Sequence, residues 1–431
     1  MKRIRSTATR AAAFLFAIAS VSALEPARAD VLALDNVPGA TLLFPYFEVD
    51  LTSSTGRTTL LSWHAASPTA QLTHVTVWTD LGMPVLSFNV YLTGYDVVAI
   101  DMRDLLVSGN LPATASAGQD PSDTISPKGF WSQDINYASC YGQLPYATPA
   151  LEASFIADLQ SALTGGPAVF LGGQCSGFNH HDHIARGYVT VDAVSNCTVR
   201  SPGDSGYFAN DGNGDAVDEG NGYGSLTGEY YLIDVGTNLM HQDAAVSIEA
   251  LHASTDARTS TANNYTFYGR LDAWSAADNR EPLPNTWAVD AQAQGTELIV
   301  WRDVKNLPTS FSCAQSVAPA SGLPLSQQAA FSFDNQEQPT AIPAGTPFGL
   351  ATQRVALGGA TFPLPAKPGW VYLGLSHVNS AAQGTNPSTD TAADQAYVTV
   401  LQYPESHVTS TGSSAIALDS GQAAQHSHPA D

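Results

Sequence analysis

The stretch from Thr41 to Leu106 alternates apolar and polar positions with a period of two. In QLTHVTVWTD, for example, Val75 and Val77 alternate with Thr76. Turn-forming residues interrupt these runs at Gly82, Pro84 and Gly94. Runs of this period, rich in β-branched and aromatic residues and cut by such turns, predict successive antiparallel strands that form one sheet.

Short strand-like runs recur along the rest of the chain, separated by turn residues. They are predicted at 168–171, 184–192, 229–235, 245–251, 264–271, 297–303, 329–333, 369–375 and 395–402. Recurring short strands are typical of a β-sandwich. We therefore predict a mainly β fold of antiparallel β-sandwich architecture, with two packed sandwich-like domains.

One amphipathic helix is predicted over residues 149–164. Its apolar stripe is formed by Leu151, Phe155, Ile156, Leu159 and Leu163. Thr148 is placed to cap the helix, Pro149 suits its first turn, and Gly165 can end it. The spacing predicts a helix that packs on the sheet.

Residues 1–29 have the pattern of a signal peptide. Basic residues precede a short apolar run, and Ala27 and Ala29 stand where a signal peptidase reads small side chains. The apolar run falls short of the roughly 20 residues that span a bilayer. We predict cleavage before Asp30 and a secreted or periplasmic protein without a transmembrane segment; an uncleaved anchor is the alternative.

The remaining chain divides into three parts by composition. We predict an N-terminal β-rich domain with one helix at 30–200, and a C-terminal β-sandwich domain at 201–403. Residues 404–431 are mostly small and polar and predict a disordered tail.

The chain is acidic, with 17 Lys and Arg residues against 39 Asp and Glu, a net charge of −22. Such a surface repels nucleic acid, so no nucleic-acid partner is predicted. Hydrophobic residues make up 44% of the chain, which is enough to form a core.

Four cysteines, Cys140, Cys175, Cys197 and Cys313, are expected to form two disulfides in an oxidising compartment. Three connectivities are open. Because Cys140 and Cys175 flank the predicted helix, we favour that pair, which leaves Cys197 with Cys313. The spacings contain no C-x-x-C and do not suit a zinc site.

Three phrases carry a resemblance: LFPYFEVD at Leu43–Asp50, FNVYLTGYDV at Phe88–Val97, and ADNREPLP with LIVWRD at Ala277–Pro284 and Leu298–Asp303. In these the chain resembles a family of secreted, β-rich bacterial proteins without an established activity. The resemblance implies a bacterial origin and an extracytoplasmic address. It carries no catalytic residue or cofactor.

The sequence GDSG at Gly203–Gly206 matches the core of the trypsin-like serine protease motif. His64 and Asp101 precede Ser205 in the chain order of that triad, as base and orienting carboxylate. The flanking residues depart from the motif, because Tyr207 replaces a second glycine. The alternative is a simple turn stabilised by Asp204 or Ser205.

An acidic loop places oxygen ligands at alternate positions in Asp211, Asn213 and Asp215, followed by Asp218. This spacing resembles the first half of an EF-hand-like calcium loop. Ala216 and Gly222 occupy the positions of the usual glycine and bidentate glutamate, so only an irregular Ca²⁺ site is expected. A solvated acidic turn is the alternative.

The segment Asn179–His183 holds three histidines and an aspartate. If Ile184 begins a strand, His181 and His183 should point to the same side and could bind Zn²⁺ or Cu²⁺. A third ligand would have to come from elsewhere, and a polar loop is the alternative.

Seven tryptophans are spread along the chain, at positions 63, 78, 131, 274, 287, 301 and 370. Exposed aromatic side chains serve sugar-binding sandwiches as platforms, whereas buried ones belong to the core. The sequence does not say which of these tryptophans is exposed.

These observations predict a non-enzymatic, secreted or periplasmic protein with a structural or ligand-binding role in the envelope or extracellular space. A cell-surface, glycan or protein partner is expected, with Ca²⁺ as the one candidate cofactor. The alternative is a secreted hydrolase, either serine-type through His64, Asp101 and Ser205 or metal-dependent through His181 and His183.

Overall fold

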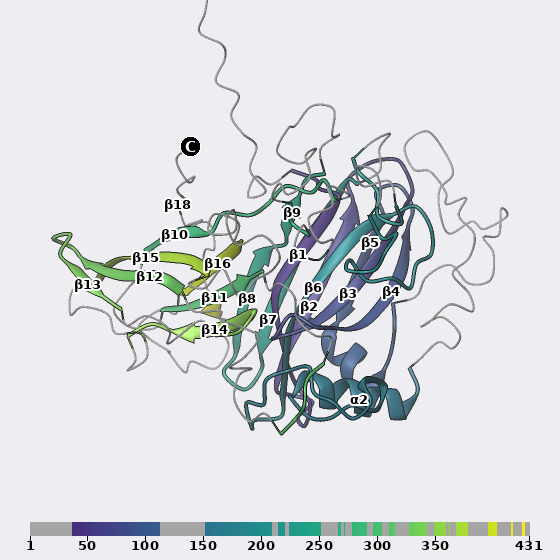
Figure 1. Ribbon diagram of the computed structural model, residues 1–431, viewed down its shortest axis with the longest axis horizontal. Coiled ribbons are helices and arrows are strands. Elements are labelled where there is room, and N and C mark those ends of the chain that lie inside the picture. The colour runs from purple at the N-terminus through teal and green to yellow at the C-terminus, as the bar shows by residue number, and fades with distance from the viewer. Residues whose placement is uncertain are drawn as a thin grey trace, which may run out of the picture. The chain divides into compact units, whose positions relative to one another are not determined.

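A computed structural model of the chain is shown in Figure 1. It describes residues 37–112, 151–208, 214–219, 224–250, 266–268, 271, 278–290, 296–303, 310–314, 327–342, 349–358, 362, 368–377, 395–402, 415–416 and 425–426. Over these residues the protein is mainly β, with several antiparallel sheets and a single helix of more than two turns. The predicted fold class is therefore confirmed. The predicted signal peptide, Cys140, Asp211 and Asn213 lie outside the described residues.

Two sheets face each other around the first core and form the first sandwich. One has the order β4 (Pro84–Leu92), β3 (Gln71–Thr79), β6 (Ile184–Val194), β1 (Thr41–Asp50) and β9 (Val246–Ile248). The other has the order β17 (Ala415–Ile416), β8 (Leu239–Ala244), β7 (Leu226–Asp234), β2 (Arg57–Ala65) and β5 (Val97–Asp101). Neighbouring strands are antiparallel except for β17 and β8.

The first core explains why strand β1 is buried at nearly every position. Leu42 and Phe44 lie in the first core, whereas Leu43 points to the opposite face and packs in a separate cluster with Tyr188. Alternate side chains of a strand leave opposite faces. A strand that is apolar on both faces must therefore be covered on both, and β1 and β3 are.

A second pair of sheets surrounds the second core. Their orders are β13 (Pro339–Ala341), β12 (Gln327–Asp334), β15 (Pro368–His377), β10 (Thr286–Asp290) and β18 (Gln425–His426), and β14 (Thr352–Ala356), β11 (Thr296–Arg302) and β16 (Ala396–Gln402). Leu298 and Val300 of β11 lie in this core, and Ile299 between them lies in the first core. The three-stranded sheet is thus apolar on both faces.

The division into domains at residue 200 stays a prediction. Among the described residues, strands β7 and β9 follow this position in the chain and pair with β2 and β1, which precede it. Of the predicted tail, only 415–416 and 425–426 are described, as the two-residue strands β17 and β18.

The helix α2 spans Ala153–Leu163, within the predicted range of 149–164. Glu152 occupies the N-cap position, and residues 148–150 lie outside the described residues. Leu159 and Leu163 of the predicted stripe are buried in the first core. None of the helices in the described ranges has the length and apolar character of a membrane span.

Two predicted strands are wrong. Residues Val169–Leu171 form a 3₁₀ turn, η2, which Gly172 ends in the left-handed conformation. In 264–271, the described residues Thr266, Phe267 and Tyr268 belong to no strand. The second short helical element, η1, is a π-helical turn at Asp104–Ser108.

A disulfide joins Cys175 to Cys313, 138 residues apart in the chain. The favoured pair of Cys140 with Cys175 is therefore wrong. Backbone hydrogen bonds between Cys175 and Phe311 hold the two segments in an isolated bridge, which sets the two sulfur atoms within bonding reach. Cys197 is also in a disulfide.

We expect the second disulfide to be Cys140–Cys197, because this is the one connectivity of three that contains Cys175–Cys313. Non-reducing peptide mapping would check the assignment, and a Cys140–Cys313 peptide would contradict it.

In the chain-entropy model, a disulfide between residues 138 positions apart stabilises the folded state by about 5 kcal/mol. The Cys175→Ser/Cys313→Ser variant should therefore lose up to this amount of unfolding free energy in urea, and an unchanged midpoint would show that the bond adds nothing.

A buried ion pair between Asp192 and Arg280 fixes loops onto the outer face of the first sandwich. Both side chains are fully buried, with Nε of Arg280 3.8 Å from Oδ1 of Asp192. Asp192 accepts hydrogen bonds from the hydroxyls of Thr41, Tyr207 and Tyr268. Four donor groups from separate segments thus surround one carboxylate, which offsets the cost of burying it.

Asp192→Asn should lower the free energy of unfolding by about 3 kcal/mol, because it removes one of the two carboxylates paired with the buried Arg280 and leaves Asp278 as the other. Urea unfolding would measure the loss. The matched control is Asp182→Asn, which breaks the half-exposed pair of Asp182 with Arg186 and should cost at most about 1 kcal/mol. Equal losses in the two variants would contradict the role given to burial.

Candidate functional site

The structure does not bring His64 and Asp101 together. Asp101 of β5 pairs with Leu60 of β2, so His64 lies four positions further along, about 13 Å away. The imidazole of His64 instead contacts the hydroxyl of Thr227, with 2.5 Å between Nε2 and Oγ1. Asp101 accepts a hydrogen bond from Thr58. The histidine–carboxylate contact of a serine-type triad is absent between these two residues.

The GDSG segment forms a turn. The carboxylate of Asp204 accepts a hydrogen bond from the backbone N–H of Ser201 at 2.6 Å, and the N–H of Tyr207 donates to the carbonyl of Asp204. Gly206 has a φ of +89°, which favours glycine. Ser205 is exposed at the tip of the turn. These hydrogen bonds and the positive φ of Gly206 are those of a turn, so the turn alternative explains the sequence GDSG.

Two of the predicted calcium ligands, Asp215 and Asp218, are described and buried. Oδ2 of Asp215 accepts hydrogen bonds from Thr198 at 2.6 Å and from Arg200 at 2.9 Å. That oxygen is therefore already bonded to a hydroxyl and a guanidinium. The Ca²⁺ site stays a prediction, because Asp211 and Asn213 lie outside the described residues.

Glu219 ends the acidic loop as a half-buried carboxyl group. Burial raises its pKa to about 8, and the neighbouring Glu249 contributes to the increase. Its Oε1 accepts a hydrogen bond from the backbone N–H of Ala250 at 3.0 Å, which favours the charged form but does not outweigh burial. A large fraction of this side chain is protonated at neutral pH.

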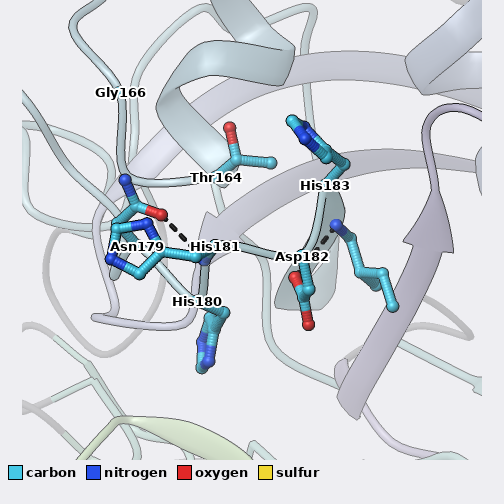
Figure 2. A pocket seen from close by; sticks show the side chains of 8 residues that line it. Thr164, Gly166, Asn179, His180, His181, Asp182 and His183 are labelled. Carbon is cyan, nitrogen blue, oxygen red and sulfur yellow. Dashed lines mark hydrogen bonds between the residues drawn. The ribbon is translucent and has the colours of Figure 1, made fainter.

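The three histidines of the Asn179–His183 turn do not converge. Figure 2 shows the rings of His180, His181 and His183 pointing in different directions. His181 and His183 have φ values of 58° and 57°, so the backbone leaves the pleated path that would put them on one side. The expectation that they share a side is wrong, although Ile184 does begin β6. The described residues contain no cluster of three metal-ligating side chains.

The side chain of His180 has a specific partner in Asp80. The distance from Nε2 of His180 to Oδ2 of Asp80 is 2.8 Å. Asp80 is fully buried, and burial raises the pKa of its carboxyl group, against the opposing effect of His180 and of the Phe178 N–H bond. His180 also lines two cavities.

One cavity, of about 270 Å³, lies over the histidine turn and is lined by Thr164, Gly166, Asn179 and residues 180–184 (Figure 2). The other, of about 230 Å³, shares His180 with the first. We call this second cavity the arginine pocket. Besides His180, it is lined by Tyr46, Glu48, Arg57, Arg186, Glu297 and Arg354.

The arginine pocket is organised around the carboxylate of Glu48, which is only 3% exposed. Oε1 of Glu48 accepts a hydrogen bond from Arg354 at 2.7 Å. Oε2 accepts bonds from Arg57 and from the hydroxyl of Tyr46, each at 3.2 Å. Arg354 also donates through Nε to Glu297 at 2.6 Å.

Strands from three sheets position these groups. Tyr46 and Glu48 lie on β1, Arg57 begins β2, and Arg354 lies on β14. Burial, together with the charge of Glu48, raises the pKa of Tyr46 well above its usual 10. The phenol therefore stays protonated and remains a hydrogen-bond donor. The pocket offers both strong donors and strong acceptors.

Sequence reasoning did not single out these residues as a site. Tyr46 and Glu48 stand in the phrase LFPYFEVD, which carries the resemblance but implies no functional residue, and Arg354 lies on a strand that the sequence does not predict. A signal was available in the composition. Lys and Arg number only 17 in 431 residues, and three of them line this one cavity.

Comparisons with protein-family models, with curated proteins and with solved structures find no match for this chain. The chemistry of the pocket itself is therefore the basis for a functional proposal.

The raised pKa of Glu219 predicts a pH dependence of stability. Its folded pKa of about 8 exceeds the usual 4.5, so the folded state holds a proton that the unfolded state releases between these values. The contribution of Glu219 to the free energy of unfolding is therefore largest below pH 4.5. It decreases as pH rises to 8, by at most about 1.4 kcal/mol per pH unit.

Thermal unfolding in EDTA-containing buffers at pH 5, 6.5 and 8 would test this expectation. Glu219→Gln should flatten the decline and melt higher than the wild type at pH 8. Glu337→Gln, a change at an exposed position, should leave the decline as it is. A wild-type profile that rises from pH 5 to 8 in step with Glu219→Gln would contradict the assignment.

Proposed function

We propose that this protein is a secreted or periplasmic, non-enzymatic binding protein whose arginine pocket holds a saccharide. The address rests on the signal-peptide pattern of residues 1–29. The binding role rests on one observation, the concentration of guanidinium, carboxylate and phenol groups around a cavity of about 230 Å³.

The mixed charge of the pocket favours a neutral, polyhydroxylated ligand. A simple anion would be attracted by the pocket's arginines but repelled by Glu48 and Glu297, and a simple cation would meet the reverse. The third arginine, Arg186, is already paired with Asp182. Sugar hydroxyls donate to carboxylates and accept from guanidiniums at the same time. They can join the existing network without unbalancing its charges.

The size of the pocket favours one sugar ring. Pockets for drug-sized ligands measure roughly 300–1,000 Å³, and the arginine pocket, at about 230 Å³, is smaller. Its walls are partly apolar, because Leu350 and the stems of the arginines line it. Such walls suit the C–H faces of a sugar ring, while the charged heads bind its hydroxyls.

The hydrolase alternative gains no support from the described residues. His64 and Asp101 have separate partners, Ser205 lies on an exposed turn, and His181 and His183 point apart. We therefore develop the binding function alone.

Isothermal titration of the purified chain against a sugar panel would test the proposal. The panel should contain neutral hexoses and pentoses, N-acetylated amino sugars, sugar acids and, for comparison, phosphate and acetate. At least one sugar class should bind. Tyr46→Phe and Arg354→Gln should each weaken it about tenfold or more, since hydrogen bonds to charged groups contribute about 1.5–3 kcal/mol.

Arg200→Gln is the matched control, because this arginine is paired with one carboxylate outside the pocket. It should bind the sugar as the wild type does. Tyr46→Phe keeps the buried ring and removes only a hydroxyl, which separates loss of binding from loss of folding. Binding of phosphate but of no sugar, or sugar affinity equal in all four proteins, would overturn the proposal.

A further inference from the structure

Four aromatic side chains form two rows on the outer face of the sheet that contains β12 and β15. Phe333 pairs with Trp370, and Phe331 pairs with Tyr372, in the register of these strands. The rings of Phe333 and Trp370 are stacked, with centroids 4.0 Å apart and planes inclined by 7°. The centroids of Phe331 and Tyr372 lie 6.3 Å apart.

The alternation of the strands places these rings on the side away from the second core. Val371 and Leu373, the neighbours of Tyr372 along β15, are fully buried in that core. On β12, Ala330 and Ser332 are buried in the same way. Alternate residues leave opposite faces, so all four aromatic rings lie on the outer face. We call them the aromatic rows.

Trp370 in the aromatic rows is partly exposed, whereas the other described tryptophans are buried. Trp63, Trp78, Trp287 and Trp301 are at most 3% exposed and belong to the cores. Trp370 and its three aromatic neighbours are half-buried. Two further tryptophans lie outside the described residues. Among the described tryptophans, Trp370 is therefore the one available for contact with a ligand.

The surroundings of the aromatic rows are polar, and the charged residues of the β12–β13 hairpin, Asp334 and Glu337, are both acidic. Pro339 and Ala341 of β13 extend the two rows at the sheet edge and are exposed. The hairpin between β12 and β13 presents the amides of Gln336 and Gln338. The nearby carboxylate of Asp334 accepts hydrogen bonds from the backbone N–H groups of both glutamines and is used within the turn.

We propose that the aromatic rows are a binding surface for a neutral polysaccharide chain. Phe333 and Trp370 cover one face of each other, so the surface that they present is the outer side of this stack. Such apolar aromatic surfaces suit the C–H faces of sugar rings, and the flanking amides can bind hydroxyls. The two rows lie about 6.7 Å apart along the strands, so successive sugars of a chain can each contact a row. The net charge of −22 disfavours anionic polymers.

The aromatic rows belong to the second pair of sheets, and none of their four residues lines the arginine pocket. This surface goes beyond the proposed function, because it predicts attachment to an extended glycan in addition to capture of one sugar ring. A second copy of the chain is the competing occupant, since exposed aromatic faces also serve as dimer interfaces.

Affinity gel electrophoresis in neutral polysaccharides would test the surface. Suitable gels contain hydroxyethyl cellulose, mixed-linkage β-glucan, xylan or galactomannan, with an anionic polygalacturonate gel for comparison. The wild type should be retarded by at least one neutral polymer. Trp370→Ala and Phe333→Ala should each raise the dissociation constant about tenfold, the loss of one well-placed stacking contact of about 1.4 kcal/mol.

Tyr95→Ala is the matched control, because Tyr95 is an aromatic residue 52% exposed on another part of the chain. It should bind as the wild type does. Tyr46→Phe should also keep polysaccharide binding, and Trp370→Ala should keep the single-sugar binding of the arginine pocket, so that failure of either proposal can be recognised separately.

Sedimentation of the same proteins covers the remaining outcomes. The wild type and Trp370→Ala should have the same mass in solution. A dimer that Trp370→Ala converts to a monomer would assign the rows to self-association and overturn the proposal. Retardation by no neutral polymer, or equal retardation of Trp370→Ala and Tyr95→Ala, would overturn it as well.

Discussion

The buried carboxylate of Glu48 is the interaction on which both the architecture and the pocket depend. It sits on β1, accepts a bond from Arg57 of β2 and another from Arg354 of β14, and so connects three of the four sheets. Burying a single carboxylate would cost several kcal/mol. Two guanidiniums and a phenol offset that cost here, and the groups that do so form the wall of a cavity. Stability and the candidate site therefore have a common origin.

Much of the fold follows from periodicity, because period-two runs such as QLTHVTVWTD can bury one face only as strands. The strands that the sequence does not predict are short or polar, with two to six residues each: β8, β10, β13, β14, β17 and β18. In β14, the sequence TQRVA has little apolar alternation. Contacts of Arg354 with carboxylates on other strands hold this strand instead. The Cys175–Cys313 bond was missed for a related reason, since 138 residues separate partners that only the folded chain brings together.

The candidate site was less predictable, because its chemistry comes from residues that local motifs do not mark. The GDSG and His-His-Asp-His segments attracted interest as contiguous patterns, yet both are turns whose polar groups bond nearby backbone. His180 is the histidine with a buried partner, and that partner, Asp80, lies 100 residues away in the chain. Convergence of this kind depends on strand order and register, which periodicity alone does not determine.

The small number of basic residues bears on both proposed binding surfaces. A chain with 17 basic residues that commits Arg57, Arg186 and Arg354 to one cavity leaves little positive charge elsewhere for an anionic partner. Each of these guanidiniums is paired with a carboxylate, Arg57 and Arg354 with Glu48 in the cavity wall and Arg186 with Asp182 beside it. On the outer face of β12 and β15 the contact groups are rings and amides. Both surfaces therefore discriminate by hydrogen bonding and shape, and a neutral carbohydrate is the ligand class that satisfies both.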